Sequence, residues 1–362
     1  MSRYHPGRDG IVARLEVRRE TGEGGLEQWS DAGPINLDSA TAATLVDSKA
    51  DTPTGSAVPA KRKRMLPRRT KLFLSPNAKV KGDRKENFLF HHSSDGADTN
   101  LLILLHGAGD THRAFREFAK RMDLPQTATL SIHASSCSSG FSTLPFNLGY
   151  TWFEEMCTAT GDALEDRDHR RVASLRSAID NLIKILQSLY PQEGDNVNDG
   201  WMPERIFLFG YSAGACLVME TCLRLMKRKE MPIGGAVCVA GGIKCEMPPE
   251  EKEKAVAHLD STHCFEGPTP VLLIIGSQDM NFPPDAARNA SSLYNDTHKR
   301  LITLQSSMAK LAPAAKIFIK DGKGAAMIGS EDEMRCIMEF LATRLVRETP
   351  ASAMGGTAPS QS

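Results

Sequence analysis

The sequence of 362 residues has no net charge, few aromatic side chains and no long apolar run. Lys and Arg together number 44, as do Asp and Glu, and aromatic residues make up 6% of the chain. A chain without an excess of cations lacks the field that holds a polyphosphate, which disfavours nucleic-acid binding by the whole fold. No apolar stretch approaches the roughly 20 residues that a membrane-spanning helix needs. With 41% hydrophobic residues, the composition is typical of a soluble, globular protein.

The 8 cysteines form no CxxC pair and follow no regular spacing, which predicts reduced thiols rather than a disulfide scaffold or a zinc site. Cys216, Cys222 and Cys238 lie among Leu, Val and Met, so we expect them to be small buried hydrophobic residues. The first residues contain no apolar segment of the kind found in a cleaved secretion signal. We therefore expect an intracellular protein, located in the cytoplasm or the nucleus.

Residues 1–68 are rich in Gly, Ser, Thr, Ala and charge and lack a sustained apolar period, which predicts a disordered N-terminal extension. The extension ends in a basic run of Lys61, Arg62, Lys63 and Arg64. Such a run is a candidate binding site for a nuclear import receptor or an anionic surface, and the alternative is a solvated linker that nothing binds. Residues 349–362 also have few core-forming side chains and are predicted to be a disordered tail.

Residues 69–348 alternate apolar, strand-like runs with segments of helical period, which predicts one α/β domain with a mostly parallel sheet and helices on both faces. The expected strands are residues 101–105, 129–133, 205–209, 236–240, 271–275 and 316–319. A long amphipathic helix is indicated by Val172, Leu175, Ile179, Leu182, Leu186 and Leu189. A closing helix begins at a capping box formed by Ser330 and Glu333.

The most specific local pattern is Gly-Tyr-Ser-Ala-Gly, which lies between the predicted strand at 205–209 and the helical stretch 215–226. A serine on a sharp strand-to-helix turn has strained backbone angles, and small flanking residues such as Gly210 and Gly214 let the chain double back. The turn exposes the Ser212 hydroxyl above the sheet edge, next to the N-terminus of a helix. The pattern predicts a nucleophile elbow, and the alternative is a structural glycine-rich turn.

Such a serine needs backbone N–H groups that stabilise the negative charge developing on its substrate. The segment His-Gly-Ala-Gly-Asp-Thr at 106–111 closes the first strong strand, and we expect the N–H groups of Ala108 and Ala213 to form the oxyanion hole. The alternative for 106–111 is an ordinary glycine-rich loop. His106 is expected to be structural rather than a catalytic base.

Four segments together, LLILLHGAGDT, LPFNLGYTWF, FLFGYSAGA and LLIIGSQDMNFPP, resemble the phospholipase/carboxylesterase family of α/β-hydrolases, which includes the acyl-protein thioesterases. The resemblance extends from about residue 71 to residue 347. It implies an eight-stranded, mostly parallel sheet and a catalytic triad in the chain order Ser, Asp, His. On this chain it implies Ser212 as the nucleophile and Asp279 as the acid that orients the histidine, and the alternative for Asp279 is a solvated turn carboxylate.

The histidine that the resemblance implies, just beyond the last strand, is replaced by Ala325 in Asp-Gly-Lys-Gly-Ala-Ala-Met-Ile at 321–328. No histidine follows His298, which we place on a helix before the last strand, and His112 is expected to be a surface residue at a helix start. A serine hydroxyl needs a neighbouring base, so activity should be strongly impaired. Two explanations stay open: a degenerate hydrolase that binds without turnover, or a variant of an active esterase.

The sequence thus predicts a serine hydrolase that cleaves carboxylic esters or thioesters of acyl groups on small molecules or proteins. The alternative is a catalytically inactive protein that binds an acylated ligand or partner in the same fold. Trp152 and Phe153 resemble the family's segment beside the substrate, although packing explains them equally well. The sequence contains no GxGxxG, no phosphate-binding lysine loop and no metal-ligand spacing, so no cofactor is expected.

Overall fold

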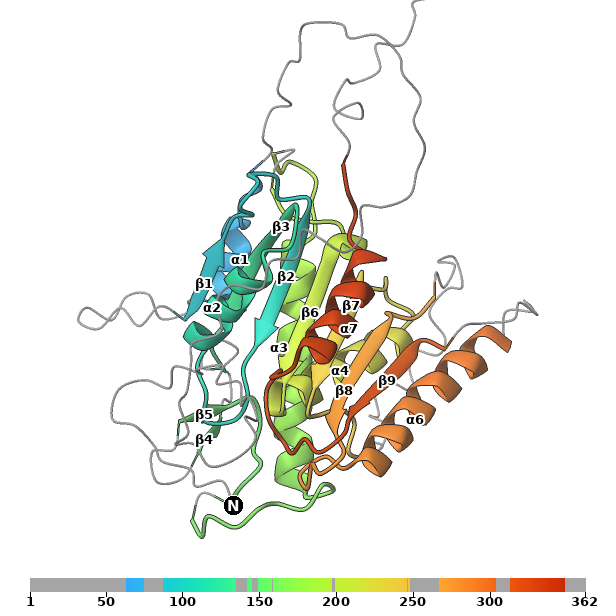
Figure 1. Ribbon diagram of the computed structural model, residues 1–362. Helices are drawn as coiled ribbons and strands as arrows, with labels where there is room; N and C mark the ends of the chain where they lie inside the picture. The colour runs from blue at the N-terminus through green and yellow to red at the C-terminus, as the bar shows by residue number, and fades with distance from the viewer. Residues whose placement is uncertain are drawn as a thin grey trace, which may run out of the picture. The chain divides into compact units, whose positions relative to one another are not determined.

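The computed structural model (Figure 1) describes residues of the unit that spans residues 61–362. The described residues are 63–74, 87–134, 142–144, 149–157, 159–196, 199–245, 247, 267–303 and 313–348. Residues 1–62 and 349–362, for which the sequence predicts disorder, lie outside the described residues. They include Lys61 and Arg62 of the basic run.

The centre of the unit is a sheet in the order β1-β3-β2-β6-β7-β8-β9. Its strands are β1 (Phe88–His91), β2 (Asn100–Leu105), β3 (Thr127–Ile132), β6 (Ile206–Tyr211), β7 (Gly235–Val239), β8 (Val271–Gly276) and β9 (Ala315–Lys320). Only β1 pairs antiparallel to its neighbour, and the other pairings in this sheet are parallel. The mostly parallel sheet is confirmed, with seven strands in the described residues where the resemblance implied eight. A separate short hairpin pairs β4 (Ser142–Thr143) with β5 (Tyr150–Thr151).

Helices cover both faces of the sheet, as predicted (Figure 1). One face packs against α1 (Arg68–Leu74), α3 (His169–Leu189), α4 (Ala213–Lys227) and α6 (Pro284–Thr303), and the other against α2 (His112–Met122) and α7 (Glu331–Ala342). Each face of the sheet has its own hydrophobic core. Successive side chains of a strand point to opposite faces, so Leu101 and Ile103 pack in the core beneath α3 and α4, and Leu102 and Leu104 pack in the core beneath α2 and α7. This is why β2 is apolar and buried along its whole length. Within the described residues, no helix combines the length and apolar character needed to cross a membrane.

The long helix and the buried cysteines agree with their predictions. The apolar residues that predicted α3 are buried along it, and the Asp168 side chain accepts a hydrogen bond from the Arg170 N–H at its N-terminus. Cys216, Cys222 and Cys238 are buried and unpaired. Burial in apolar surroundings raises the pKa of Cys216 to about 11, so this thiol is neutral at physiological pH.

The folded structure begins before the predicted boundary at residue 69. Leu66 is only 3% exposed and belongs to the core. The Arg64 N–H donates to Asp98 Oδ2 at 2.9 Å, and its guanidinium donates to the Gly200 carbonyl. Arg64, the last residue of the basic run, therefore contacts the domain, and the apolar side chain two residues further on is buried in it.

The turn before α7 is fixed by Glu333, which is 1% exposed. The capping box is confirmed, with the Ser330 N–H donating to Glu333 Oε2 and the Ser330 hydroxyl accepting from the Glu333 N–H. Lys323 also pairs with the Glu333 carboxylate. Because Lys323 belongs to the segment 321–328 that contains Ala325, this buried pair ties that segment to the start of α7.

We predict that Glu333→Ala lowers the free energy of unfolding by about 3 kcal/mol, since it leaves the Lys323 ammonium without its buried partner. The matched control is Glu331→Ala in the same helix turn, where an exposed carboxylate pairs with Arg335. We expect that control to change stability by less than about 1 kcal/mol. Urea unfolding of both variants at neutral pH measures the difference, and equal values would contradict this account of the turn.

Candidate active site

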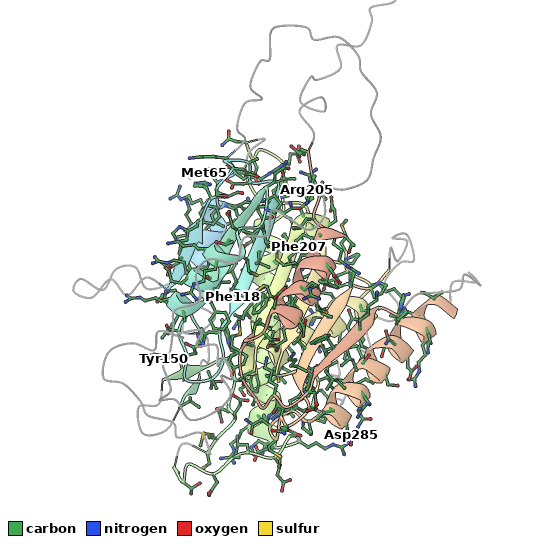
Figure 2. All side chains as sticks on the ribbon, in the orientation of Figure 1. Met65, Phe118, Tyr150, Arg205, Phe207 and Asp285 are labelled. Atoms are coloured by element: carbon green, nitrogen blue, oxygen red, sulfur yellow. The ribbon has the colours of Figure 1, made fainter. Side chains whose placement is uncertain are left out.

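The predicted site residues follow four parallel strands at the edge where those strands end. The oxyanion segment follows β2, Ser212 follows β6, Asp279 follows β8 and Ala325 follows β9. In a parallel sheet these carboxyl ends meet at one edge, where open α/β folds bind their ligands. Figure 2 shows Tyr150 and Asp285 towards this end of the sheet, and Met65 and Arg205 at the opposite end.

Ser212 has a strained backbone conformation between β6 and α4. Its φ is 51° and its ψ is −116°. A side chain is disfavoured in this region, whereas glycine adopts it freely because the mirror-image angles are ordinary extended ones. The Ser212 N–H donates to the Val239 carbonyl at 2.8 Å, and the Ser212 carbonyl accepts the Cys216 N–H of α4. These backbone hydrogen bonds stabilise the strained conformation of Ser212, as a nucleophile elbow requires.

The glycines around Ser212 are required by close backbone contacts. A Cβ atom on Gly210 would lie 2.4 Å from the Gly214 carbonyl oxygen, and one on Gly214 would lie 2.5 Å from the Leu105 oxygen. A Cβ on Gly241, after β7, would lie 2.4 Å from the Ser212 oxygen. The turn therefore packs between the ends of β2 and β7, and no Cβ atom fits at Gly210 or Gly214 without a shift of the backbone.

The predicted oxyanion segment lies directly beside Ser212. A Cβ atom on Gly107 would lie 3.5 Å from the Ser212 Cβ, which places the loop after β2 next to the elbow. Ala108 is the next residue and is exposed. Ala213 is the first residue of α4, where an N–H has no acceptor within its own helix. The structure thus brings both candidate donor residues next to the serine.

Trp152 and His106 fix the loop after β2. The Trp152 indole N–H donates to the His106 carbonyl at 2.7 Å, and Trp152 and Phe153 are buried, so packing accounts for both aromatic residues. His106 is fully buried; its Nδ1 donates to the Gly107 carbonyl at 2.7 Å and its Nε2 accepts the Ala134 N–H at 3.0 Å. Burial lowers the pKa of His106 to about 3. Both ring nitrogens are engaged, which supports a structural role.

The other two histidines considered as bases are buried. His112 is 5% exposed at the start of α2 and contacts the ring of His133. It was predicted as a surface residue, and that prediction is wrong, because its ring packs against the ring of His133 rather than facing solvent. His298 lies on α6, as predicted, and desolvation lowers its pKa.

Asp279 is a buried carboxylate with one oxygen satisfied and one not. It is 1% exposed, so it is not the solvated turn residue that was its alternative. Its Oδ1 accepts the N–H groups of Asn281 and Phe282, each at 2.9 Å. Its Oδ2 is buried and accepts no hydrogen bond within the described part of the chain. A buried acceptor without a donor costs about 1–3 kcal/mol, so the structure retains an unfavourable feature beside the site.

Ala325 lies in a turn that is tied to the Asp279 loop and to the elbow. The Gln278 N–H donates to the Lys323 carbonyl at 2.8 Å, and a Cβ atom on Gly276 would meet that same carbonyl oxygen. The Ala325 carbonyl accepts the Tyr211 hydroxyl at 3.1 Å. The Ala325 side chain is exposed. The position that the resemblance assigned to histidine therefore lies at the site.

Tyr211 links three parts of the site and was not identified from the sequence. Its ring packs on Gly107, and its hydroxyl bonds to Ala325. Desolvation raises the pKa of Tyr211, with further contributions from the negative charges of Asp110 and Asp279. The only signal in the sequence was its position beside the elbow serine.

Comparison with known proteins identifies the family. A model of the phospholipase/carboxylesterase family matches residues 89–313. The chain belongs to this family. The match includes the elbow and Asp279 and ends before the turn that contains Ala325.

This chain resembles two curated fungal proteins, and each of them is named as an uncharacterized hydrolase. One, from Mycosarcoma maydis, is 30% identical over 162 residues, which are 42% of this chain and 52% of that protein. The other, from Schizosaccharomyces pombe, is 27% identical over 149 residues, or 40% of this chain and 53% of that protein. The chain therefore spans about half the length of the curated relatives that it matches.

Similar solved structures include an esterase named PE8, with a TM-score of 0.47, 24% identity and coverage of 71% of this chain and 98% of that chain. Another is acyl-protein thioesterase 2 of Zea mays, with a TM-score of 0.46, 12% identity and coverage of 72% and 99%. Within the described ranges of the chain, no group of three or more His, Cys, Asp or Glu side chains is placed to hold a metal ion.

We predict that Ser212→Gly is more stable than Ser212→Ala by about 1 kcal/mol, because only glycine relieves a strain that costs about 1–3 kcal/mol. The matched control is Ser174 in the second turn of α3, where the glycine variant should be less stable than the alanine variant by about 1 kcal/mol. Urea unfolding of the four variants tests the opposite signs. A glycine variant at 212 that is less stable than alanine would exclude the strained elbow.

Proposed function

We propose that this protein has the site of a serine esterase or thioesterase that acts on acyl groups, with Ser212 as nucleophile and Asp279 as the acid of an incomplete triad. The observation that supports it most is the strained serine beside the glycine loop after β2. A structural glycine-rich turn does not require a side chain at φ 51°, and here the residue that bears the strain is the one with a hydroxyl.

The proposed reaction begins when Ser212 Oγ attacks the carbonyl carbon of an ester or thioester. The carbonyl oxygen becomes an oxyanion that accepts hydrogen bonds from the N–H groups of Ala108 and Ala213. The alcohol or thiol leaves, and water then hydrolyses the acyl-serine to release the acid. Each half of the reaction needs a base to take a proton and an acid to return it.

The Ala325 side chain can act neither as the base nor as the acid of this reaction, so we propose that turnover by this chain is strongly impaired. Loss of one triad member typically lowers the rate by about 10⁴- to 10⁶-fold. The unsatisfied Oδ2 of Asp279 supports this interpretation, because a histidine at 325 would supply the missing donor.

A second candidate function is binding of an acylated ligand or partner without turnover. The observation that favours it is the alanine itself, since the elbow, the glycine loop and the buried acid are all present around an exposed Ala325. Such a protein would retain the affinity of the site and lack the base. The two candidates differ in what happens when a histidine is restored.

We predict that Ala325→His increases kcat/KM for p-nitrophenyl acyl esters by about 10²- to 10⁴-fold, the usual contribution of a general base. The gain should rise with pH through about 6.5, since only a neutral imidazole accepts the serine proton. The same substitution should accelerate labelling of Ser212 by a fluorophosphonate. Rates and labelled peptides measure both effects.

The matched control is Ala326→His, which introduces an imidazole one residue away in the same exposed turn. It should give no gain, and Ser212→Ala in the Ala325→His background should remove the gain altogether. A folded Ala325→His variant without increased hydrolysis or labelling would exclude the esterase and favour the binding protein.

A further inference from the structure

The outer face of α1 presents apolar and basic side chains to solvent. Leu72 is 63% exposed and Phe73 is 48% exposed, whereas the next residue, Leu74, is fully buried. Arg68 and Lys71 are exposed as well. In an α-helix the residues i, i+3 and i+4 lie on one face, so Leu72 shares its face with both of these cations. The exposed face of this short helix is therefore apolar and basic at once.

The contacts of the inner face fix how the outer face is presented. The Thr70 hydroxyl donates to the Ser188 carbonyl, at the C-terminal end of α3, at 2.9 Å. Arg69 Nε donates to the same carbonyl at 2.7 Å, and its guanidinium binds both carboxylate oxygens of Asp195 at 2.8 and 2.9 Å. Leu74 packs in the hydrophobic core. The helix therefore cannot turn its exposed apolar residues inward without breaking these contacts.

The charge around α1 is positive, although the whole chain has no net charge. Residues 61–71 contain seven Lys and Arg and no Asp or Glu. In the described residues 190–196 after α3, the acidic residues are Glu193 and Asp195, and the Asp195 charge is neutralised by Arg69. Lys63 adds a further exposed cation ahead of the helix. This surface therefore complements an anionic partner.

We propose that the outer face of α1 docks on an anionic lipid bilayer, with Leu72 and Phe73 in the interfacial region and the neighbouring cations against the headgroups. Helices that lie on membranes combine large apolar residues with Lys and Arg in this way. Each cation near an anionic leaflet adds to the binding, and its effect falls off within a Debye length. The inference goes beyond the proposed function, and α1 precedes the residues 89–313 that match the family.

The docking surface lies away from the candidate active site. The end of α3 that α1 contacts is close to the start of β6, since the Trp201 N–H donates to the Leu189 carbonyl. Figure 2 shows Met65, three residues before α1, at the opposite end of the sheet from Tyr150. The elbow follows the carboxyl end of β6. Docking through α1 would therefore leave the elbow uncovered.

A nuclear import receptor is the other partner that the basic run suggests, and the contacts of Arg64 disfavour it. A receptor that binds the run as an extended peptide needs accessible main-chain and side-chain groups. The Arg64 N–H donates to Asp98, its guanidinium donates to the Gly200 carbonyl, and Leu66 is buried. Such a receptor would have to displace these contacts, whereas a bilayer can bind α1 without any rearrangement.

The experiment measures cosedimentation of the full chain with phosphatidylcholine vesicles that contain about 30% phosphatidylserine, and with vesicles of phosphatidylcholine alone. We expect binding to the anionic vesicles to be at least about 10-fold tighter, and to be largely lost when salt is raised from about 0.1 M to about 0.5 M. Ser212→Ala should bind as the unaltered chain does, because docking does not involve the proposed nucleophile. Failure of this inference therefore leaves the proposed function intact.

Two double variants and one tryptophan probe locate the surface. Arg68→Gln with Lys71→Gln should weaken binding to anionic vesicles by at least about 10-fold, since each cation contributes about 5-fold in affinity. Leu72→Ser with Phe73→Ser should weaken it by at least about 10-fold, because both apolar side chains lose their place in the interface. In Phe73→Trp, bromine-labelled lipids should quench fluorescence beyond the quenching seen with the unaltered chain.

Matched controls change exposed residues elsewhere on the domain. Arg288→Gln with Lys299→Gln removes two exposed cations from α6. Met280→Ser removes an apolar side chain that is 90% exposed near the candidate active site. Both controls should bind anionic vesicles as the unaltered chain does, because they lie outside the docking surface.

Three outcomes would overturn the inference. The first is no vesicle binding, or equal binding to the two kinds of vesicle. The second is equal weakening by the α1 variants and by their controls, with all of the proteins folded by circular dichroism. The third is capture of a purified import receptor by the chain without vesicle binding, which would assign the basic run to a protein partner.

Discussion

The strained turn at Ser212 is the constraint on which the rest of the site depends. A side chain at φ 51° persists only if its neighbours hold it, and here they are the backbone of β7, the first turn of α4 and the end of β2. The close approaches at Gly210, Gly214 and Gly241 leave no room for a Cβ atom. The parallel sheet supplies this arrangement, because it brings the carboxyl ends of adjacent strands to the same edge.

The other candidate site residues are arranged around that turn. The loop after β2 lies beside the serine, and Tyr211 connects that loop with the turn containing Ala325. Asp279 is buried with one acceptor unused. A binding protein has no evident need for an unsatisfied buried carboxylate, whereas a triad without its histidine has one as a direct consequence. The incomplete triad that we propose accounts for this carboxylate, and the Ala325→His variant distinguishes it from a binding protein.

Much of the fold followed from the sequence because its signals are local. The apolar run that became β2, the period of α3 and the capping box at Ser330 depend on residues a few positions apart. The elbow also is local, since its glycines flank the serine. These features are determined by backbone sterics and by burial of one helix face, both of which are visible in short segments.

The features that sequence reasoning missed depend on contacts between distant segments. The Tyr211 hydroxyl meets a carbonyl 114 residues away, and Arg64 bonds to Asp98 across 34 residues. The burial of His112 depends on the ring of His133 from the end of β3. Composition placed the domain boundary too late, because one buried leucine ahead of α1 is a weak signal among charged neighbours. None of these contacts has a characteristic spacing.

The central claim is that Ser212, Asp279 and residue 325 converge on the place of one imidazole ring. A crystal structure of the Ala325→His variant tests it most directly. The account predicts that one ring nitrogen lies about 2.6–3.2 Å from Asp279 Oδ2 and the other within similar reach of Ser212 Oγ. A ring that points to solvent, with Asp279 Oδ2 still without a donor, would contradict it.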